Sequence, residues 1–87
     1  MTSTTQNVKS DDGDLVYAEE LVSKLFTYHP PSPKQIPKYN ELRDRAKVFA
    51  KFIVQSCPES RERSLAITNL QQVVMWANAS IAINESE

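Results

Sequence analysis

The chain has 87 residues, of which 40% are hydrophobic and 24% charged, and its formal net charge is −1. This composition is typical of a globular protein and not of a disordered one. A near-neutral charge argues against a protein that binds duplex DNA or RNA, because such proteins usually carry a basic surplus. No apolar run approaches the ~20 residues that span a membrane, so we expect no membrane partner.

The cysteine and histidine content excludes the usual supports of small domains. Cys57 is the only cysteine and cannot form a disulfide within the chain. With His29, the only histidine, it cannot supply the four ligands of a structural zinc site. We therefore expect no metal and no cofactor, and self-association is the remaining way to stabilise so small a core. The unpaired cysteine and the polar N-terminal segment favour a cytoplasmic protein.

The first third of the chain predicts a tail, a short helix and a stiff connector. Residues 1–13 are rich in Thr, Ser, Gln, Asn and Asp, which predicts a flexible tail. Asp14 is a good helix N-cap, and apolar residues at helical spacing predict an amphipathic helix over 14–26. Three prolines in segment 27–33 predict an extended connector that carries Tyr28.

The rest of the chain predicts an antiparallel helical hairpin. Pro37 suits a first helical turn, and a heptad seam predicts a helix over 37–56 that Cys57-Pro58 ends. The seam consists of Tyr39, Leu42, Ala46, Phe49 and Ile53. Ser60 can cap a helix over 60–83, which must fold back because only a few residues separate the two helices. Its seam consists of Ile67, Leu70, Val74, Ala77 and Ile81. The predicted fold class is all-α, with a single helical domain over 14–87.

The last predicted helix carries apolar residues beyond its seam. They are Leu65, Ala66, Val73, Met75 and Trp76. An apolar arc this wide is typical of an association surface. The alternative is that the first helix covers the extra arc within the same chain.

The sequence contains no motif for catalysis. It lacks a GxGxxG loop, a P-loop, an HExxH helix and a paired CxxC. Cys57 could act as a nucleophile with His29 as its base, but a lone thiol at a helix end is more often a packing residue. We expect no enzyme and no catalytic residues.

Three side chains are candidates for binding an anionic, aromatic ligand. Tyr28 lies on the stiff connector, where its ring could stack on a nucleobase. Arg43 and Lys47 are four residues apart and share a helix face, a spacing that suits phosphate oxygens.

The basic residues also have a simpler interpretation. Together with Arg45, the residues at 43 and 47 could form a solvated face paired with Glu41 and Asp44. Arg61 and Arg63 could form an anion site at a helix N-terminus or be plain surface charges.

Four segments carry a family resemblance: FTYHPP at 26–31, YNELR at 39–43, CPESRERSLAIT at 57–68 and VMWANASIA at 74–82. Over about residues 26–82 the chain resembles the phage anti-CBASS protein 2 family, and its longer leader is similar to that of the member from T4-like phages. The specific part of this pattern is the combination of SRExS at 60–64 with MWANA at 75–79.

The resemblance implies a sponge for the cyclic oligonucleotide signals of bacterial CBASS defence. Family members bind cyclic dinucleotides, such as cyclic GMP-AMP, without cleaving them, in pockets between the protomers of a hexamer of helical hairpins. Some members also bind cyclic trinucleotides at a separate site. By this resemblance, Tyr28 stacks on a base, Arg43 or Lys47 contacts the phosphate, and Phe26 walls the pocket. The protein would act in the cytoplasm of the infected bacterial host.

The sequence leaves three other functions open. A helical adaptor would bind a host protein through the apolar arc and would not need Tyr28. A weak nucleic-acid binder would use the basic residues of the middle helix, against the near-neutral net charge. A cyclic-nucleotide phosphodiesterase would need metal ligands or a general base that the sequence does not offer.

Overall fold

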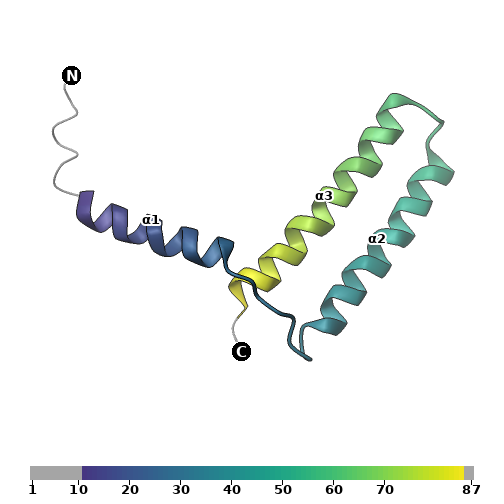
Figure 1. The fold of residues 1–87 in the computed structure, drawn as a ribbon. Coiled ribbons are helices and arrows are strands. Elements are labelled where there is room, and N and C mark those ends of the chain that lie inside the picture. The colour runs from purple at the N-terminus through teal and green to yellow at the C-terminus, as the bar shows by residue number, and fades with distance from the viewer. Residues whose placement is uncertain (1–10, 86–87) are drawn as a thin grey trace, which may run out of the picture.

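The computed structural model describes residues 11–85, which form three α-helices and no strand (Figure 1). The helices are α1 (Asp11–Phe26), α2 (Ile36–Ser56) and α3 (Arg61–Asn84). The prediction of an all-α chain built on a helical hairpin is confirmed. Residues 1–10, which make up most of the predicted tail, lie outside the described residues. Within the described segment no helix is long and apolar enough to cross a lipid bilayer.

The first helix begins three residues earlier than the sequence predicted. It starts at Asp11, so Asp14 lies inside its first turn and the prediction of Asp14 as N-cap was wrong. Gly13 does not end the helix, because one glycine costs only about 1 kcal/mol relative to alanine. Asp14 is also favourable where it lies, since the N-terminal turn carries a partial positive charge.

The hairpin turn is held by polar contacts at both helix ends. Ser60 is the N-cap of α3, as predicted, and its Oγ accepts a hydrogen bond from the Arg63 N–H at 3.1 Å. The Arg63 guanidinium donates in turn to the carbonyls of Val54 and Cys57, each at 3.3 Å. These are carbonyls that the end of α2 leaves without a helical partner. Arg63 therefore serves the turn in this structure.

The two helices of the hairpin lie side by side and antiparallel (Figure 1). All five predicted seam residues of α3 are partly buried against α2. On α2 the seam drifts: Phe49 is 52% exposed, and Ala50 is partly buried beside it. A straight α-helix repeats every 3.6 residues, so a strict heptad seam moves off the contact line along its length.

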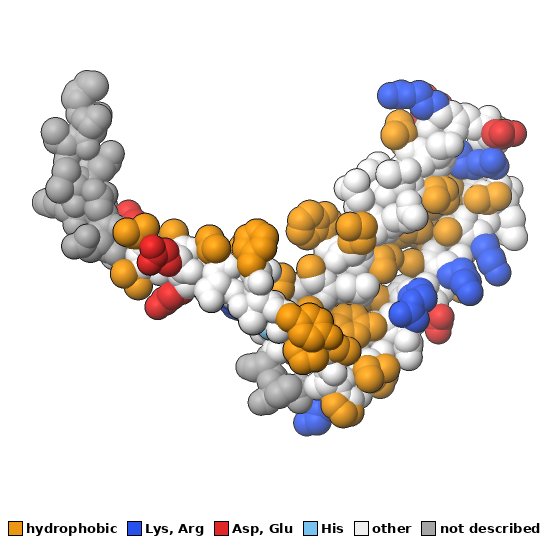
Figure 2. All heavy atoms as spheres, in the orientation of Figure 1, with side chains coloured by type: hydrophobic (Ala, Val, Ile, Leu, Met, Phe, Trp, Pro, Cys, Tyr) orange, Lys and Arg blue, Asp and Glu red, His pale blue; other side chains and the backbone are white. Residues whose placement is uncertain are grey.

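The described residues contain no buried hydrophobic side chain. Along its shortest axis the molecule measures 13 Å, close to the ~10–12 Å width of one helix with its side chains. A hydrophobic core needs two packed layers, and one chain supplies a single layer. Apolar side chains consequently lie open to solvent along α1 and the hairpin (Figure 2).

Helix α1 does not cover the extra apolar arc of α3. It runs away from the hairpin (Figure 1), and only its C-terminal part meets the end of α3. There Leu21 and Leu25 line a shallow hollow together with Trp76. Even so, Trp76 is 71% exposed and Met75 63% exposed. The alternative in which the first helix covers this arc within the chain is wrong.

Candidate functional site

A basic stripe runs along one face of α2. We use this name for Arg43, Lys47 and Lys51, which follow one another at four-residue spacing and so lie on the same helix face. None of the three forms an ion pair with a carboxylate among residues 13–85. Arg43 donates a hydrogen bond from Nη1 to Oδ1 of Asn40 at 3.0 Å, which orients its guanidinium without neutralising it. The stripe is therefore a net positive surface.

Arg45 differs from the basic stripe because it is paired. Its Nη2 lies 2.6 Å from Oε2 of Glu41, and its Nε donates to the same oxygen at 2.9 Å. The interpretation of the basic residues as a solvated, acid-paired face is correct for Arg45. Arg43 and Lys47 are exposed as well, but neither is paired with a carboxylate of residues 13–85.

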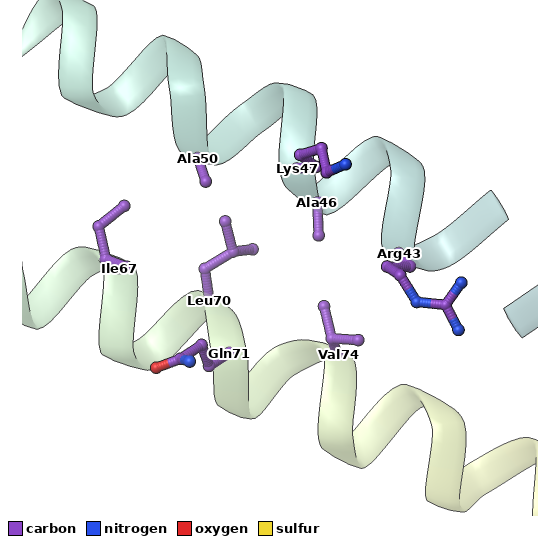
Figure 3. Close-up of a pocket in the computed structure, with 8 residues that line it drawn as sticks. All are labelled: Arg43, Ala46, Lys47, Ala50, Ile67, Leu70, Gln71 and Val74. Carbon is purple, nitrogen blue, oxygen red and sulfur yellow. The ribbon is translucent and has the colours of Figure 1, made fainter. Parts of the chain in front are cut away.

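A groove of about 280 Å³ lies beside the basic stripe, between α2 and α3. Figure 3 shows Ile67, Leu70 and Val74 of α3 pointing towards α2, with Lys47 and Arg43 on the α2 side. The groove exists because the residues of α2 that face α3 here are alanines. Its lining is Arg43, Ala46, Lys47, Ala50, Ile67, Leu70, Gln71 and Val74.

The groove combines an apolar floor with a cationic rim. This combination suits a ligand that has flat apolar faces and negative charges, since the floor excludes water and the rim meets the anion. Its volume falls just short of the ~300–1,000 Å³ of pockets that enclose a small molecule. One chain thus provides an open groove and not an enclosed pocket.

The two aromatic candidates lie apart from this groove. Phe26 ends α1 and is 83% exposed, and Tyr28 on the connector is 80% exposed. Neither side chain contributes to the groove lining. Of the four predicted site residues, the structure brings Arg43 and Lys47 together and leaves Phe26 and Tyr28 on a separate surface. Within one chain the predicted site is therefore not complete.

The neighbours of Tyr28 are anchored to the end of α1. The Thr27 hydroxyl donates to the backbone carbonyl of Ser23, and Nε2 of His29 lies 2.8 Å from the carbonyl of Lys24. Both acceptors belong to the last turn of α1, whose carbonyls have no helical partner. With the residues on either side held, Tyr28 projects its ring into solvent.

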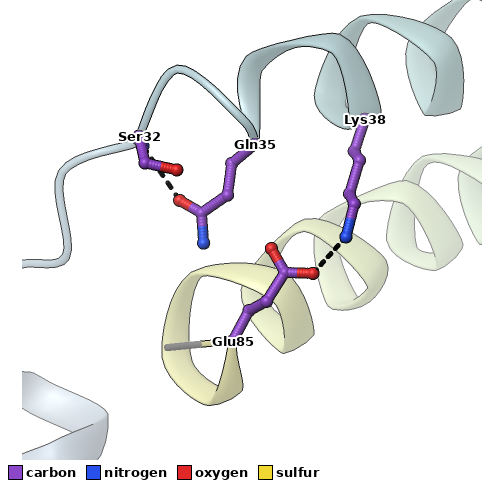
Figure 4. A network of polar contacts seen from close by, with 4 residues as sticks. All are labelled: Ser32, Gln35, Lys38 and Glu85. Carbon is purple, nitrogen blue, oxygen red and sulfur yellow. Dashed lines mark hydrogen bonds and ion pairs between the residues drawn. The ribbon is translucent and has the colours of Figure 1, made fainter. Parts of the chain in front are cut away.

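The far end of the connector is anchored to the hairpin through Gln35. At 4% exposure Gln35 is the one buried residue in the part of the chain that the structure describes. Its Oε1 accepts a hydrogen bond from the Ser32 N–H at 3.0 Å (Figure 4). The N–H groups of Gln35 and Ile36 donate to the Ser32 carbonyl at 3.0 and 3.2 Å, which closes the turn that starts α2.

An ion pair joins this turn to the end of α3. Lys38 on the first turns of α2 pairs with Glu85, 47 positions along the chain, and the Gln35 amide nitrogen faces the same carboxylate (Figure 4). The hydrogen bond from Lys38 is the main reason that the pKa of Glu85 lies below its ordinary value of 4.5, and Gln35 lowers this pKa further. We call Ser32, Gln35, Lys38 and Glu85 the connector clasp.

A protein-family model described as "Acb2/Tad1, hairpin domain" matches residues 19–82, which is most of the chain. The chain belongs to this family. The resemblance noted in the sequence is thereby confirmed at the level of the family, whereas an origin in a T4-like phage stays a prediction. No curated protein and no solved structure matched the chain in the same comparisons.

The Acb2/Tad1 hairpin match spans the end of α1, the connector and nearly all of the hairpin. It includes the four predicted site residues and every member of the connector clasp except Glu85. The sequence predicted that Arg43 and Lys47 lie together on one helix face. It gave no sign of the clasp, because polar residues far apart in sequence leave no periodic signal.

Acidification should weaken the connector clasp. The pKa of Glu85 is lower in the folded protein than the ordinary 4.5. Its contribution to stability is therefore fully present above about pH 4.5 and is lost as the pH falls through the folded-state pKa. We expect Glu85→Gln to lower the thermal midpoint at neutral pH and to match the wild type at low pH. Thermal unfolding across this pH range measures the effect.

Glu59→Gln is the matched control, since Glu59 is exposed and forms no ion pair within residues 11–85. A difference between Glu85→Gln and the wild type that stays constant across the pH range would contradict the assignment of the clasp.

Proposed function

We propose that this protein binds cyclic dinucleotide immune signals, such as cyclic GMP-AMP, and sequesters them without cleaving them. The free signal would then fall below the level that activates CBASS effectors in the cytoplasm of the infected bacterium. The observation that carries the proposal is membership of the Acb2/Tad1 hairpin family over residues 19–82. The groove supports it, because it has an apolar floor and a basic rim that no carboxylate of residues 13–85 pairs with.

The proposal includes self-association of the hairpin, as the hexamer that the family resemblance implies. Its support is the absence of any buried hydrophobic side chain from residues 13–85. Leaving this much apolar surface in water costs about 25 cal/mol for each Å². The open side chains of α3, with Trp76 the largest, would be covered by a second copy of the chain.

Assembly would also complete the ligand site. A cyclic dinucleotide has two flat bases and two negative phosphates in a closed ring. Two copies of the chain bring two Tyr28 rings and two basic stripes, which matches that composition. Two stacked bases and two charge-assisted contacts, at ~1–3 kcal/mol each, give a gross ~4–12 kcal/mol.

The gross figure sets a condition on the site. Nanomolar binding needs about −12 kcal/mol, and the costs of ordering the partners are subtracted first. Tight capture is therefore attainable only if the pocket is dry and already formed before the ligand arrives. The proline connector and the neighbouring protomers would provide this.

A second candidate function is a helical adaptor for a host protein. The exposed Val73, Met75 and Trp76 on α3 favour it, because a partner protein could cover them. An adaptor would lose function on substitution of Trp76 and would be indifferent to Tyr28.

The direct test is calorimetry of the purified protein against cyclic dinucleotides, cyclic trinucleotides and the matching linear dinucleotides. We expect tight binding of cyclic dinucleotides and weak binding of linear ones, and the trinucleotides establish whether the chain also takes the larger ring. Denaturing the complex should then release the cyclic ligand intact. Linear product would indicate an enzyme, and no binding across the panel would favour the adaptor.

Removing the ring of Tyr28 should weaken capture strongly. Tyr28→Ala loses stacking worth ~1–3 kcal/mol per base, which corresponds to an increase in Kd of about ten- to a hundred-fold. Tyr28→Phe keeps the aromatic face and should bind nearly as well as the wild type. Equal binding by the alanine variant, measured by calorimetry, would remove Tyr28 from the site.

Neutralising the groove rim should weaken capture and reduce its dependence on salt. Arg43→Gln and Lys47→Gln each remove a cation beside the groove that no carboxylate of residues 13–85 neutralises. Arg45→Gln removes one that Glu41 already neutralises. We expect about a tenfold rise in Kd for each of the first two at low ionic strength, and little change for the third. Titrations at two salt concentrations measure the effect, and equal losses at all three positions would indicate a non-specific charge effect.

A further inference from the structure

We propose that Gln35 and Glu85 are positioning residues, which set the orientation of Tyr28 through the connector clasp without contacting the ligand. This inference rests on the proposed function and adds the device that prepares its aromatic platform. It concerns the connector between α1 and the hairpin, which the groove and the basic stripe do not include.

The burial of Gln35 is the first observation. Burying an amide costs free energy unless its polar atoms are hydrogen-bonded, and here Oε1 accepts the Ser32 N–H while the amide nitrogen faces Glu85 (Figure 4). The described residues bury no apolar side chain. Gln35 is thus enclosed to make polar contacts and not to fill a core.

The second observation is that the connector is fixed at both ends. Thr27 and His29 attach one end to the last turn of α1, and the contact of Ser32 with Gln35 attaches the other end to the hairpin. Proline at 30 and 31 restricts the backbone between these attachments. A stiff link transmits a rotation at one end to the other, so the clasp determines where the Tyr28 ring points relative to α2.

Glu85 extends the attachment across the hairpin. Through Lys38 it ties the start of α2 to the end of α3, next to the turn that Gln35 closes. The orientation of the connector is therefore fixed relative to both helices that form the groove. This is the geometry needed to hold an aromatic platform at a fixed place with respect to the basic rim.

Loss of the clasp should lower the fraction of molecules with Tyr28 in place. The apparent Kd rises in inverse proportion to that fraction, so a fall to about one tenth gives about a tenfold weaker Kd. Because Gln35 fills no apolar core, its loss should change ligand affinity more than it changes assembly.

The experiment compares Gln35→Met, which keeps the side-chain length but removes both polar atoms, with Gln55→Met on the exposed end of α2. Glu85→Gln is the milder second variant, since it retains hydrogen-bonding atoms and loses the charge. Three quantities are measured for each: the Kd for cyclic GMP-AMP, the hydrogen-exchange rate of the Ser32 amide, and the ¹⁹F signal of 3-fluorotyrosine at Tyr28. The Tyr28→Phe variant assigns that signal.

We expect Gln35→Met to weaken binding about tenfold, to speed exchange of the Ser32 amide and to shift the Tyr28 signal, at an unchanged native mass. Glu85→Gln should change all three in the same direction by less, and Gln55→Met should change none. Unaltered affinity together with faster Ser32 exchange would overturn the positioning role. If the wild type binds no cyclic dinucleotide, the proposed function fails. The two ligand-free signals then decide the clasp: an unshifted Tyr28 signal in Gln35→Met refutes it.

Discussion

A single layer of helices cannot fully bury its apolar side chains, because a hydrophobic core needs a second layer packed against it. The hairpin of α2 and α3 packs along one seam, and α1 leaves it at the connector. Seams of alanine, leucine, isoleucine and valine are enough to pair the two helices. They leave residues such as Trp76 and Phe52 exposed over more than half of their surface. The exposed apolar surface that leaves the single chain without a hydrophobic core would be covered by other copies in the proposed assembly.

The candidate site follows from the same architecture. Because Ala46 and Ala50 are small, the seam is shallow beside the basic stripe, and a groove opens there. Arg45 is neutralised by Glu41, whereas Arg43 donates a hydrogen bond to the neutral amide of Asn40 and keeps its charge. Arg45 and Arg43 lie on different faces of α2, so one is a paired surface charge and the other is a candidate to contact a phosphate. The aromatic partner lies on the connector, which polar contacts anchor at both ends.

Local pattern was sufficient to predict the elements of the fold. Proline at 37, the cap at Ser60 and the seam of α3 are signals that act over a few residues, and each found its expected place. The start of α1 was missed because Asp14 is acceptable both as a cap and inside a first turn. Phe49 was misplaced because a heptad pattern does not follow a straight helix.

The parts of the site that depend on distant contacts could not be predicted in the same way. Lys38 and Glu85 meet only after the hairpin closes. No pattern around Gln35 predicts that its side chain is buried. Arg43 and Lys47 were found because they are neighbours on one helix. In the proposed assembly a second copy of the chain would bring Tyr28 to them, and no periodicity within one copy encodes that contact.

Native mass spectrometry of the protein, free and with a saturating cyclic dinucleotide, tests the central claim most directly. The claim is that hairpins cover one another's apolar faces and create the ligand site between them. We expect a closed oligomer in both samples, with one ligand for every two chains and no ligand on any residual single chain. A monomer in the free sample, or single chains that each carry a ligand, would contradict the account.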